Sequence, residues 1–432
     1  MTRQAVKSSW KPSTGNSCVY STKIIESNVE KYEAATKTKL VRYDYARIAE
    51  IIPILTRVYN DGKPLRGLKS EEADFIRNEQ VLSKLDFHYW TERYCHINYG
   101  GINQMGAGVM AMWESQRMLL RLVGSCEETS WDAFNRGETC DGILVANNKA
   151  RQMGATMICR AIIMHRETTH KHTRGFSASV DDDKVAELYT RDKNIHNNLP
   201  FYLRPSLDSR DESIDQQSQL LHYGKLSSSI LYQTSNQKSG FGQGRTFDVS
   251  HITEAASFDA DGRGFGMIEH DFLPTIPQTP NVFCLLESTP QGRGNTWHTW
   301  SEAVRLGNKA RWKYLFVPAY INRDRNRRTP PINWQPAEHT LKYAIHIETT
   351  SPAVVGYKVT PDRDYLYWYE TQRKEYYDSG KLNMFYTNFA STPEESFQFV
   401  TSGAFDAELL NDLSLDNEPG VSYEFEPASM RF

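Results

Sequence analysis

Short apolar runs alternate with helical segments through the middle of the chain. Runs typical of buried β-strands cover residues 143–146, 173–180, 227–234, 246–252, 281–287 and 312–318. Between them, residues 157–164 form an apolar segment that we interpret as a buried helix, and residues 185–197 have a helical pattern. This alternation predicts an α/β fold with a mainly parallel sheet covered by helices on both faces.

The flanking regions have different patterns. Residues 1–38 are polar and are expected to form a loose arm, whereas residues 43–59 and 70–85 have helical spacing of apolar positions, as do residues 110–123 of the core. Pro53 is expected to kink or restart the first of these helices, and Ser70 to cap the second. The first part of the chain is therefore predicted to be a helical appendage.

The pattern changes again after the pair Pro330-Pro331. Residues 363–377 are helical and rich in aromatic side chains, residues 385–399 are irregular, and the segment after residue 403 is biased towards acids. We therefore divide the chain into an N-terminal arm and appendage (1–90), a core (91–330) and a small C-terminal subdomain with a linker (331–432).

Composition and charge limit the compartment and the chemistry of the protein, but they do not identify a binding partner. The 432 residues include 50 basic and 53 acidic side chains, so the net charge of −3 neither demands nor excludes a nucleic acid. The six cysteines form no Cys-x-x-Cys pair, which argues against disulfides and zinc. No apolar stretch is long enough to span a bilayer, and the N-terminus lacks a signal-peptide core. We expect a soluble, intracellular protein.

The polar stretch 147–156 lies between the first strand and the apolar helix. A loop in this place directs backbone N–H groups of a helix N-terminus outwards, which favours a phosphate. Gly154 and Thr156 occupy the second glycine and hydroxyl positions of the usual Gly-x-x-x-x-Gly-Lys-Ser/Thr pattern. Ala155 stands at the usual lysine position, and Lys149 at the first glycine position. Taken alone, the stretch fits a nucleotide site or an ordinary polar turn.

Two later strands supply the other parts that a nucleotide hydrolase needs. Residues 247–253 form a strand followed by Glu254, a carboxylate able to activate water, and by small residues. Residues 281–287 form a buried strand followed by the hydroxyls of Ser288 and Thr289, which suit a polar sensor. The order of phosphate loop, acid strand and hydroxyl strand favours an ATPase.

These motifs resemble the ATPase domain of the large terminase subunit of tailed bacteriophages, the motor that packages DNA into a procapsid. The resemblance covers residues 85–407, and its most specific pieces are 149–156, 251–256, 287–292 and 392–397. In that family the phosphate-loop lysine stands at the front of the motif, which would explain Lys149 beside Ala155. The resemblance implies a P-loop NTPase fold of the ASCE/RecA-like class, with residues 331–432 as lid subdomain and linker.

The resemblance also implies how ATP and Mg²⁺ are bound. Lys149 would neutralise charge on the β- and γ-phosphates, Thr156 would ligate Mg²⁺ through its hydroxyl, and Gln116 would lie against the adenine base. The full nucleotide-binding set is Gln116, Lys149, Arg151, Gln152, Met153, Gly154, Ala155 and Thr156.

The catalytic roles follow from the same resemblance. Glu254 would polarise the attacking water, and Ser288 with Thr289 would report loss of the γ-phosphate to the lid. Arg151 would be either a phosphate contact or a link to Glu254.

Two features depart from the usual pattern. The acid strand ends Thr253-Glu254 where most such ATPases have Asp-Glu, so Mg²⁺ would be held by Thr156 and water more than by a protein carboxylate. The arginine finger often lies a short way before the glutamate, and the nearest arginine on that side is Arg245, our candidate for this catalytic role.

The resemblance implies double-stranded DNA, the portal protein with the procapsid, and the small terminase subunit as partners. It also implies a homo-oligomeric ring on the portal, in the host cell cytoplasm. We expect no nuclease activity, since the chain stops at Phe432, near where that domain would begin. The basic run 323–328 fits a DNA contact, a solvated loop or a subunit contact. A helicase-type ATPase and a nucleotide-binding scaffold without hydrolysis are the alternatives.

Overall fold

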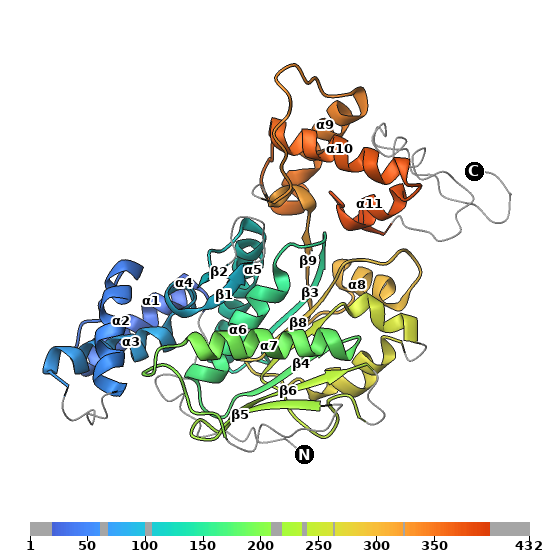
Figure 1. Ribbon diagram of the computed structural model, residues 1–432. Helices are drawn as coiled ribbons and strands as arrows, with labels where there is room; N and C mark the ends of the chain where they lie inside the picture. The colour runs from blue at the N-terminus through green and yellow to red at the C-terminus, as the bar shows by residue number, and fades with distance from the viewer. Residues whose placement is uncertain are drawn as a thin grey trace, which may run out of the picture. The chain divides into compact units, whose positions relative to one another are not determined.

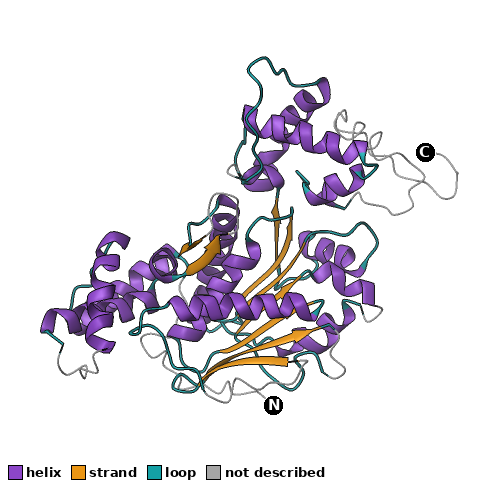
Figure 2. Ribbon diagram, viewed as in Figure 1, coloured by secondary structure: helices purple, strands orange, loops and turns teal. Residues whose placement is uncertain are grey.

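The computed structural model describes residues 20–60, 68–99, 106–208, 218–235, 240–261, 264–322 and 325–397. The chain divides into two compact units. The first comprises Met1–Asn148, Gln152–Ser288 and Thr299–Leu315, and contains most of a seven-stranded sheet. The second comprises Lys149–Arg151, Thr289–His298 and Phe316–Phe432. Figure 1 labels most helices and strands of both units, and Figure 2 colours helices and strands differently.

The seven-stranded sheet has the order β5-β6-β4-β7-β8-β3-β9. Its strands are β3 (Ile143–Lys149), β4 (Arg174–Ser179), β5 (Ser218–Tyr223), β6 (Ser228–Thr234), β7 (Val249–Thr253), β8 (Phe283–Ser288) and β9 (Lys313–Val317). The pairs β3–β8, β8–β7, β7–β4 and β4–β6 are parallel, whereas β5 pairs with β6 in antiparallel orientation. The prediction of an α/β fold with a mainly parallel sheet is confirmed.

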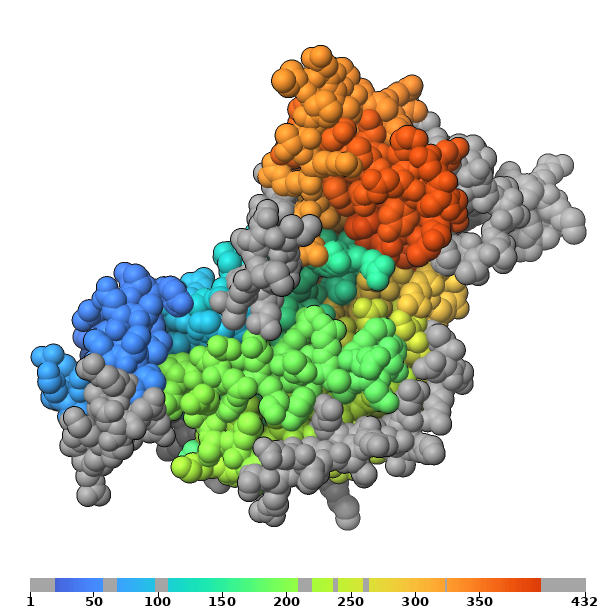
Figure 3. Space-filling model, in the orientation of Figure 1, coloured from blue at the N-terminus to red at the C-terminus, as the bar shows by residue number. Residues whose placement is uncertain are grey.

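Helices α6 (Ala155–Thr169) and α7 (Asp182–Asn198) lie side by side across one face of this sheet (Figure 1). Nearly every residue of α6 is buried, including the charged side chains of Arg160, Arg166 and Glu167. Helix α7 is the outer one, with most of its residues at least partly exposed, and it lies within the green part of the surface in Figure 3. The side chain of Asp181 caps α7 by accepting a hydrogen bond from the Lys184 N–H at 2.8 Å.

An aromatic cluster covers the opposite face of the sheet. Phe176 of β4 stacks on Phe272 at a centroid distance of 4.7 Å and also contacts Phe241 and Phe247. These partners belong to the segment that surrounds β7, which includes the short helices η3 (Ala255–Asp261), η4 (Ile268–Phe272) and η5 (Leu273–Thr275). Both faces of the central strands are therefore buried, which explains why their sequences are continuously apolar.

The N-terminal region is helical, but its first helix was not predicted. Helices α1 (Thr22–Thr36), α2 (Tyr45–Asn60), α3 (Ser70–Leu85) and α4 (Phe87–Tyr94) precede a hairpin of β1 (His96–Tyr99) and β2 (Gly106–Val109). The loose arm predicted for residues 1–38 is wrong for α1, which begins after Ser21, whose hydroxyl accepts a hydrogen bond from the Ile24 N–H. Residues 1–19 lie outside the described ranges.

Three further differences concern helix ends. Ser70 is not the cap of α3, since the N-cap position belongs to Lys69, whose N–H donates to the Glu72 carboxylate at 2.9 Å. Helix α5 (Glu114–Asn135) begins later and ends later than predicted. Pro53 is accommodated within α2.

The second unit contains η6 (Ala319–Ile321), α9 (Glu338–Val355), α10 (Arg363–Asp378), α11 (Leu382–Asn388) and α12 (Pro393–Ser396). Helix α8 (Thr296–Arg305) contributes residues to both units. Tyr343 and Tyr369 stack in the core of the second unit with centroids 3.7 Å apart. The irregular structure predicted for residues 385–399 is wrong where α11 and α12 form. The acid-biased tail lies outside the described residues.

The basic run before α9 makes ion pairs with α10. Arg327 lies 3.0 Å from Asp364, and Arg328 lies 3.8 Å from Glu375.

None of the helices in the described ranges combines the length and the apolar character that a membrane span requires.

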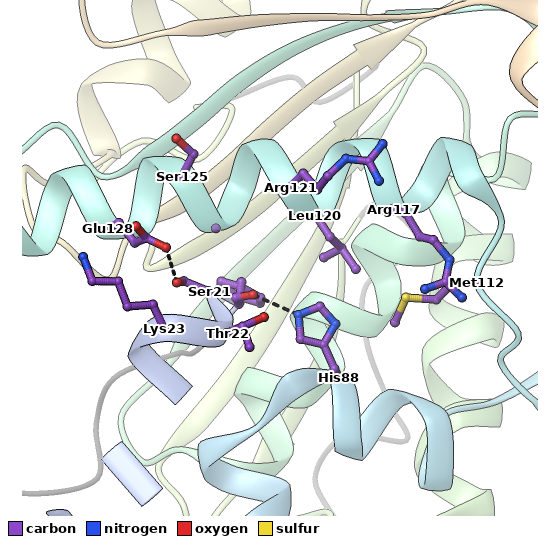
Figure 4. Close-up of a pocket in the computed structure, with 12 residues that line it drawn as sticks. Ser21, Thr22, Lys23, His88, Met112, Arg117, Leu120, Arg121, Ser125 and Glu128 are labelled. Atoms are coloured by element: carbon purple, nitrogen blue, oxygen red, sulfur yellow. Dashed lines mark hydrogen bonds between the residues drawn. The ribbon is translucent and has the colours of Figure 1, made fainter. Parts of the chain in front are cut away.

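A buried glutamate attaches the N-terminal helices to α5. The Glu127 Oε2 atom accepts hydrogen bonds from the backbone N–H groups of Tyr20 and Ser21, both at 2.8 Å. An adjoining pocket of about 560 Å³ is shown in Figure 4. In its wall, the Ser21 hydroxyl donates a hydrogen bond to Glu128, and His88 Nε2 is hydrogen-bonded to the Tyr20 carbonyl. Burial raises the pKa of the Glu127 carboxyl to about 8.

This raised pKa predicts a specific pH dependence of stability. The folded chain binds the Glu127 proton more tightly than the unfolded chain, whose carboxyl has its ordinary pKa of 4.5, so the contribution is complete below that pH and is lost as the pH rises towards 8. Glu127→Gln should remove this loss, at up to about 1.4 kcal/mol per pH unit. Urea unfolding of both proteins between pH 5 and 9 measures it. The neighbouring Glu128→Gln is the control, and a wild type whose stability stays parallel to that of Glu127→Gln would contradict the assignment.

Candidate nucleotide site

Three neighbouring strands end at one edge of the sheet and bring polar side chains together. Glu287 of β8 lies in register with Asn147 of β3 on one side and with Thr253 of β7 on the other. Side chains in register on parallel strands project from the same face, and α6 covers that face. The carboxyl edge of β7, β8 and β3 is therefore where the sequence motifs meet.

The phosphate loop turns sharply between β3 and α6. Gln152 and Gly154 both have a positive φ, of 61° and 74°. Gly154 is the N-cap of α6, so the backbone N–H groups of Ala155 and Thr156 open the helix. No acidic residue lies in the first turn of α6, which leaves the positive end of the helix dipole available to an anion.

The start of α5 holds this loop in place. Ser115 donates a hydrogen bond to the Met153 carbonyl at 2.7 Å, and the Gln116 amide donates to the Gly154 carbonyl at 3.0 Å. The Gln116 Oε1 atom accepts the Trp113 N–H at 2.9 Å. In this structure Gln116 is buried and its amide supports the loop, while its contact with an adenine base stays a prediction.

The hydroxyl of Thr156 is bound to a carboxylate from the middle strand. Thr156 donates to Glu287 Oε1 at 2.7 Å, and the same oxygen lies 3.0 Å from His251 Nε2. Glu287 and His251 are fully buried. Neither received a role from the sequence, although an acid at the end of a continuously apolar strand is a signal, since acids are almost never fully buried without a partner.

A chain of buried polar groups continues from His251 beneath α6. Arg160 contacts His251 Nδ1 at 3.4 Å, donates to Ser177 at 2.8 Å, and pairs with Asp192 of α7 at 2.9 Å. Tyr232 of β6 donates to the second oxygen of Asp192. Burial raises the pKa of Asp192 although the Arg160 charge opposes the shift. Direct contacts between buried side chains thus connect α6 and α7 with the strands β4, β6, β7 and β8.

Glu254, the predicted catalytic carboxylate, directly follows β7. Its backbone has a φ of 59°, a conformation that non-glycine residues rarely adopt. Its carbonyl accepts the Ser257 N–H at 2.8 Å. The Ser288 hydroxyl accepts the Ala256 N–H at 3.1 Å, so the end of β8 fixes the turn that carries Glu254. Such strain is commonly found at active sites.

Three predicted residues group with the second unit. Lys149 is the last residue of β3 and is buried, whereas Arg151 is exposed and donates its backbone N–H to the Asn388 carbonyl at 2.8 Å. Thr289 begins the segment 289–298, where His298 packs on Phe397. The chain therefore leaves the first unit immediately after Asn148 and again immediately after Ser288.

Arg245 is the predicted residue that lies away from the others. It is exposed in the loop before β7, whereas Glu254 follows β7, so the two residues flank opposite ends of the strand. A strand of five residues spans about 16 Å. Within one chain, the structure does not bring Arg245 to the phosphate loop.

The fold and the loop define the class of protein. The strand that ends in the predicted phosphate loop and the strand followed by a glutamate are separated by one further strand, β8, which is the strand arrangement of the ASCE-type P-loop ATPase fold. Among the described residues, no group of three or more His, Cys, Asp or Glu side chains could hold a metal ion.

Comparison with known proteins gives structural similarities alone. No family model and no curated protein matches the chain. The chain is similar to the large terminase of bacteriophage HK97, with 13% identity and a TM-score of 0.40 over 72% of this chain and 53% of that one. It is also similar to the large terminase ATPase domain of Thermus phage P74-26, with 12% identity and a TM-score of 0.31 over 41% and 76% of the two chains.

A further similarity is to the large terminase of another thermophilic bacteriophage, with 11% identity and a TM-score of 0.31 over 48% of this chain and 47% of that one. The chain thus spans about half the length of this protein and of the HK97 protein. All three are large terminases, the family that the sequence motifs resemble. Likeness at this level concerns the fold and assigns a role to no residue.

The conformation of Gly154 predicts a large effect of one methyl group. A Cβ atom at this position would lie 2.7 Å from Gln116 Nε2 and 3.0 Å from the Trp113 ring, in addition to the strain of a φ of 74°. Gly154→Ala should therefore lower the free energy of unfolding by about 2–4 kcal/mol, as strain and overpacking add. Gly137→Ala is the matched control, because its φ is 75° but nothing lies within 4 Å of its Cβ. Equal losses in denaturant unfolding would show that the contacts with α5 do not constrain the loop.

Proposed function

We propose that the chain is the ATP-hydrolysing motor of viral genome packaging, the ATPase part of a large terminase subunit. The observation that carries the ATPase is the Thr156–Glu287 hydrogen bond, which joins the first turn of α6 to the end of β8, the strand between the loop strand and the acid strand. The packaging function rests on the resemblance of the motifs 149–156, 251–256 and 287–292 to the terminases.

The triphosphate of ATP is bound mainly by the backbone. The N–H groups from Met153 to Thr156 surround the N-terminus of α6, where an anion is favoured by the helix dipole. Lys149 supplies the compact positive charge that the usual motif places at position 155. Arg151 and Gln152 are the remaining contacts that we propose from the loop.

The hydroxyl of Thr156 fits a magnesium ligand. A hydroxyl has one proton and two lone pairs, and the Thr156 proton is donated to Glu287, which leaves the oxygen as an electron-pair donor. Mg²⁺ prefers oxygen ligands and commonly binds through one or two protein groups together with substrate phosphates. When bound, Mg²⁺ neutralises charge on the transferring phosphoryl group.

Hydrolysis requires a base that orients water, and we propose Glu254 for this role. Its turn is fixed by Ser288, the residue that we propose as the first half of the coupling pair. Thr289 is the second half and begins the segment that groups with the second unit. Loss of the γ-phosphate would change the surroundings of Glu254 and Ser288, and the chain would carry this change into the lid.

The remaining partners follow from the packaging function. We propose that a homo-oligomeric ring of this chain works on the portal of the procapsid, moves double-stranded DNA, and receives it through the small terminase subunit in the host cytoplasm. Arg245 stands as our arginine-finger candidate, and its place away from its own phosphate loop suits a finger that acts on a neighbouring subunit.

Neutralising Glu254 tests the chemical step. Glu254→Gln should keep ATP affinity within a few-fold but lower kcat by about 10²–10⁴-fold, because the amide cannot accept a proton from water. Phosphate release with portal-bearing procapsids and DNA measures kcat, and a fluorescent ATP analogue measures binding. Glu187→Gln, an exposed carboxylate of α7, is the control. Wild-type turnover in Glu254→Gln would reject Glu254 as the catalytic base.

Removing the relocated lysine tests the phosphate loop. Lys149→Ala should abolish measurable ATP hydrolysis, since the β- and γ-phosphates lose their only proposed lysine. The same assay applies, with Lys184→Ala of the exposed α7 N-terminus as control. A fully active Lys149→Ala protein would mean that this chain does not use a forward lysine.

A further inference from the structure

The acid strand lacks the carboxylate that usually precedes the catalytic glutamate. In P-loop ATPases this aspartate and the loop Ser/Thr together hold the magnesium ion, but here the position is Thr253. Glu287 lies directly beside Thr253 in the register of β7 and β8. We propose that Glu287 replaces the missing aspartate as the positioning residue that orients the Thr156 hydroxyl towards the cation bound with ATP. This proposal rests on the proposed ATPase function.

The position of β8 makes this replacement feasible. Because β8 lies between β7 and β3, a side chain near its end is central at the carboxyl edge, beneath the first turn of α6. The longer glutamate reaches Thr156 at 2.7 Å from the middle strand. The hydroxyl proton then has a fixed acceptor, so the lone pairs of the oxygen have a fixed direction.

His251 fixes the carboxylate in turn. Arginine is always a donor, so the contact of Arg160 with His251 Nδ1 requires Nδ1 to act as the acceptor. The ring proton must then be on Nε2, which donates to Glu287 Oε1 at 3.0 Å. Two donors, from α6 and β7, converge on one carboxylate oxygen and prevent it from rotating.

A second observation supports a polar ligand beside Glu287. Asn147 is fully buried and in register with Glu287, and within the described part of the chain both polar atoms of its amide lack a hydrogen-bond partner. A buried amide without partners is costly unless a ligand satisfies it. Asn147, Glu287 and Thr156 thus present three polar groups at one place on the carboxyl edge.

Magnesium dependence of nucleotide binding tests this role without measuring hydrolysis. The probe is a fluorescent ATP analogue, titrated with and without Mg²⁺. Glu287→Gln should reduce the Mg²⁺-dependent gain in affinity by about tenfold or more, as observed when groups behind metal ligands are lost. Affinity in EDTA should change less than about threefold, since the backbone contacts to phosphate remain. Glu127→Gln is the control, because Glu127 is an equally buried glutamate that accepts two hydrogen bonds.

A double-mutant cycle and a rescue separate positioning from general stability. If Glu287 acts through Thr156, adding Thr156→Val to Glu287→Gln should cause little further loss, about twofold instead of another tenfold. Adding Thr253→Asp to Glu287→Gln returns a carboxylate to the usual place on the adjacent strand, and should restore the Mg²⁺ dependence to within about threefold of wild type.

The outcomes distinguish the two proposals. A wild-type chain that binds no ATP analogue with or without Mg²⁺ rejects the proposed function itself. A wild type that binds with Mg²⁺ dependence, beside a Glu287→Gln protein with the same dependence, rejects the role of Glu287 alone. Additive losses in the cycle, or no rescue by Thr253→Asp, also overturn it. If Glu287→Gln unfolds in a thermal melt, Glu287→Asp replaces it in the cycle and must show a reduced Mg²⁺ dependence.

Discussion

The hydrogen bond between Thr156 and Glu287 is the contact on which the site depends. It joins the first turn of α6 to the middle strand at the carboxyl edge, and through His251 it also joins β7. The strand order makes this convergence obligatory, because parallel strands that are neighbours must end at the same edge. The loop, the acid strand and the sensor strand are therefore held in one arrangement by a single buried carboxylate.

Much of the fold was predictable because periodic apolar runs report burial directly. The strands β3, β4, β6, β8 and β9 and the helices α6, α7 and α10 appear within a few residues of their predicted ranges. The edge strand β5 and helix α1 were not predicted, because their stability depends on contacts with distant parts of the chain. Strand β5 is hydrogen-bonded to β6 along its length. Helix α1 follows Tyr20, whose backbone N–H is bound by Glu127 of α5.

The sequence singled out candidate residues for the site, but it could not show how they are connected. Gly154 and Thr156 follow from the spacing of the loop, and Glu254 from its place after a strand. The role of Glu287 depends on which strand lies in the middle of the sheet, and sequence order does not give spatial order. Gln116 shows the same limit: the sequence singled it out, whereas its contacts with Trp113 and Gly154 require the folded chain.

The buried chain from Thr156 to Asp192 is hard to explain by stability alone. Buried ion pairs can often be replaced by apolar residues without loss, and each buried charge carries a desolvation penalty. Such a chain fixes the direction of each hydrogen bond, since Arg160 can only donate and His251 is left with one acceptor nitrogen and one donor nitrogen. An apolar core would hold α6 equally well, but it would leave the Thr156 hydroxyl free to rotate. For the cation site that we propose, this fixed direction of the Thr156 oxygen is the advantage that would offset the desolvation penalty.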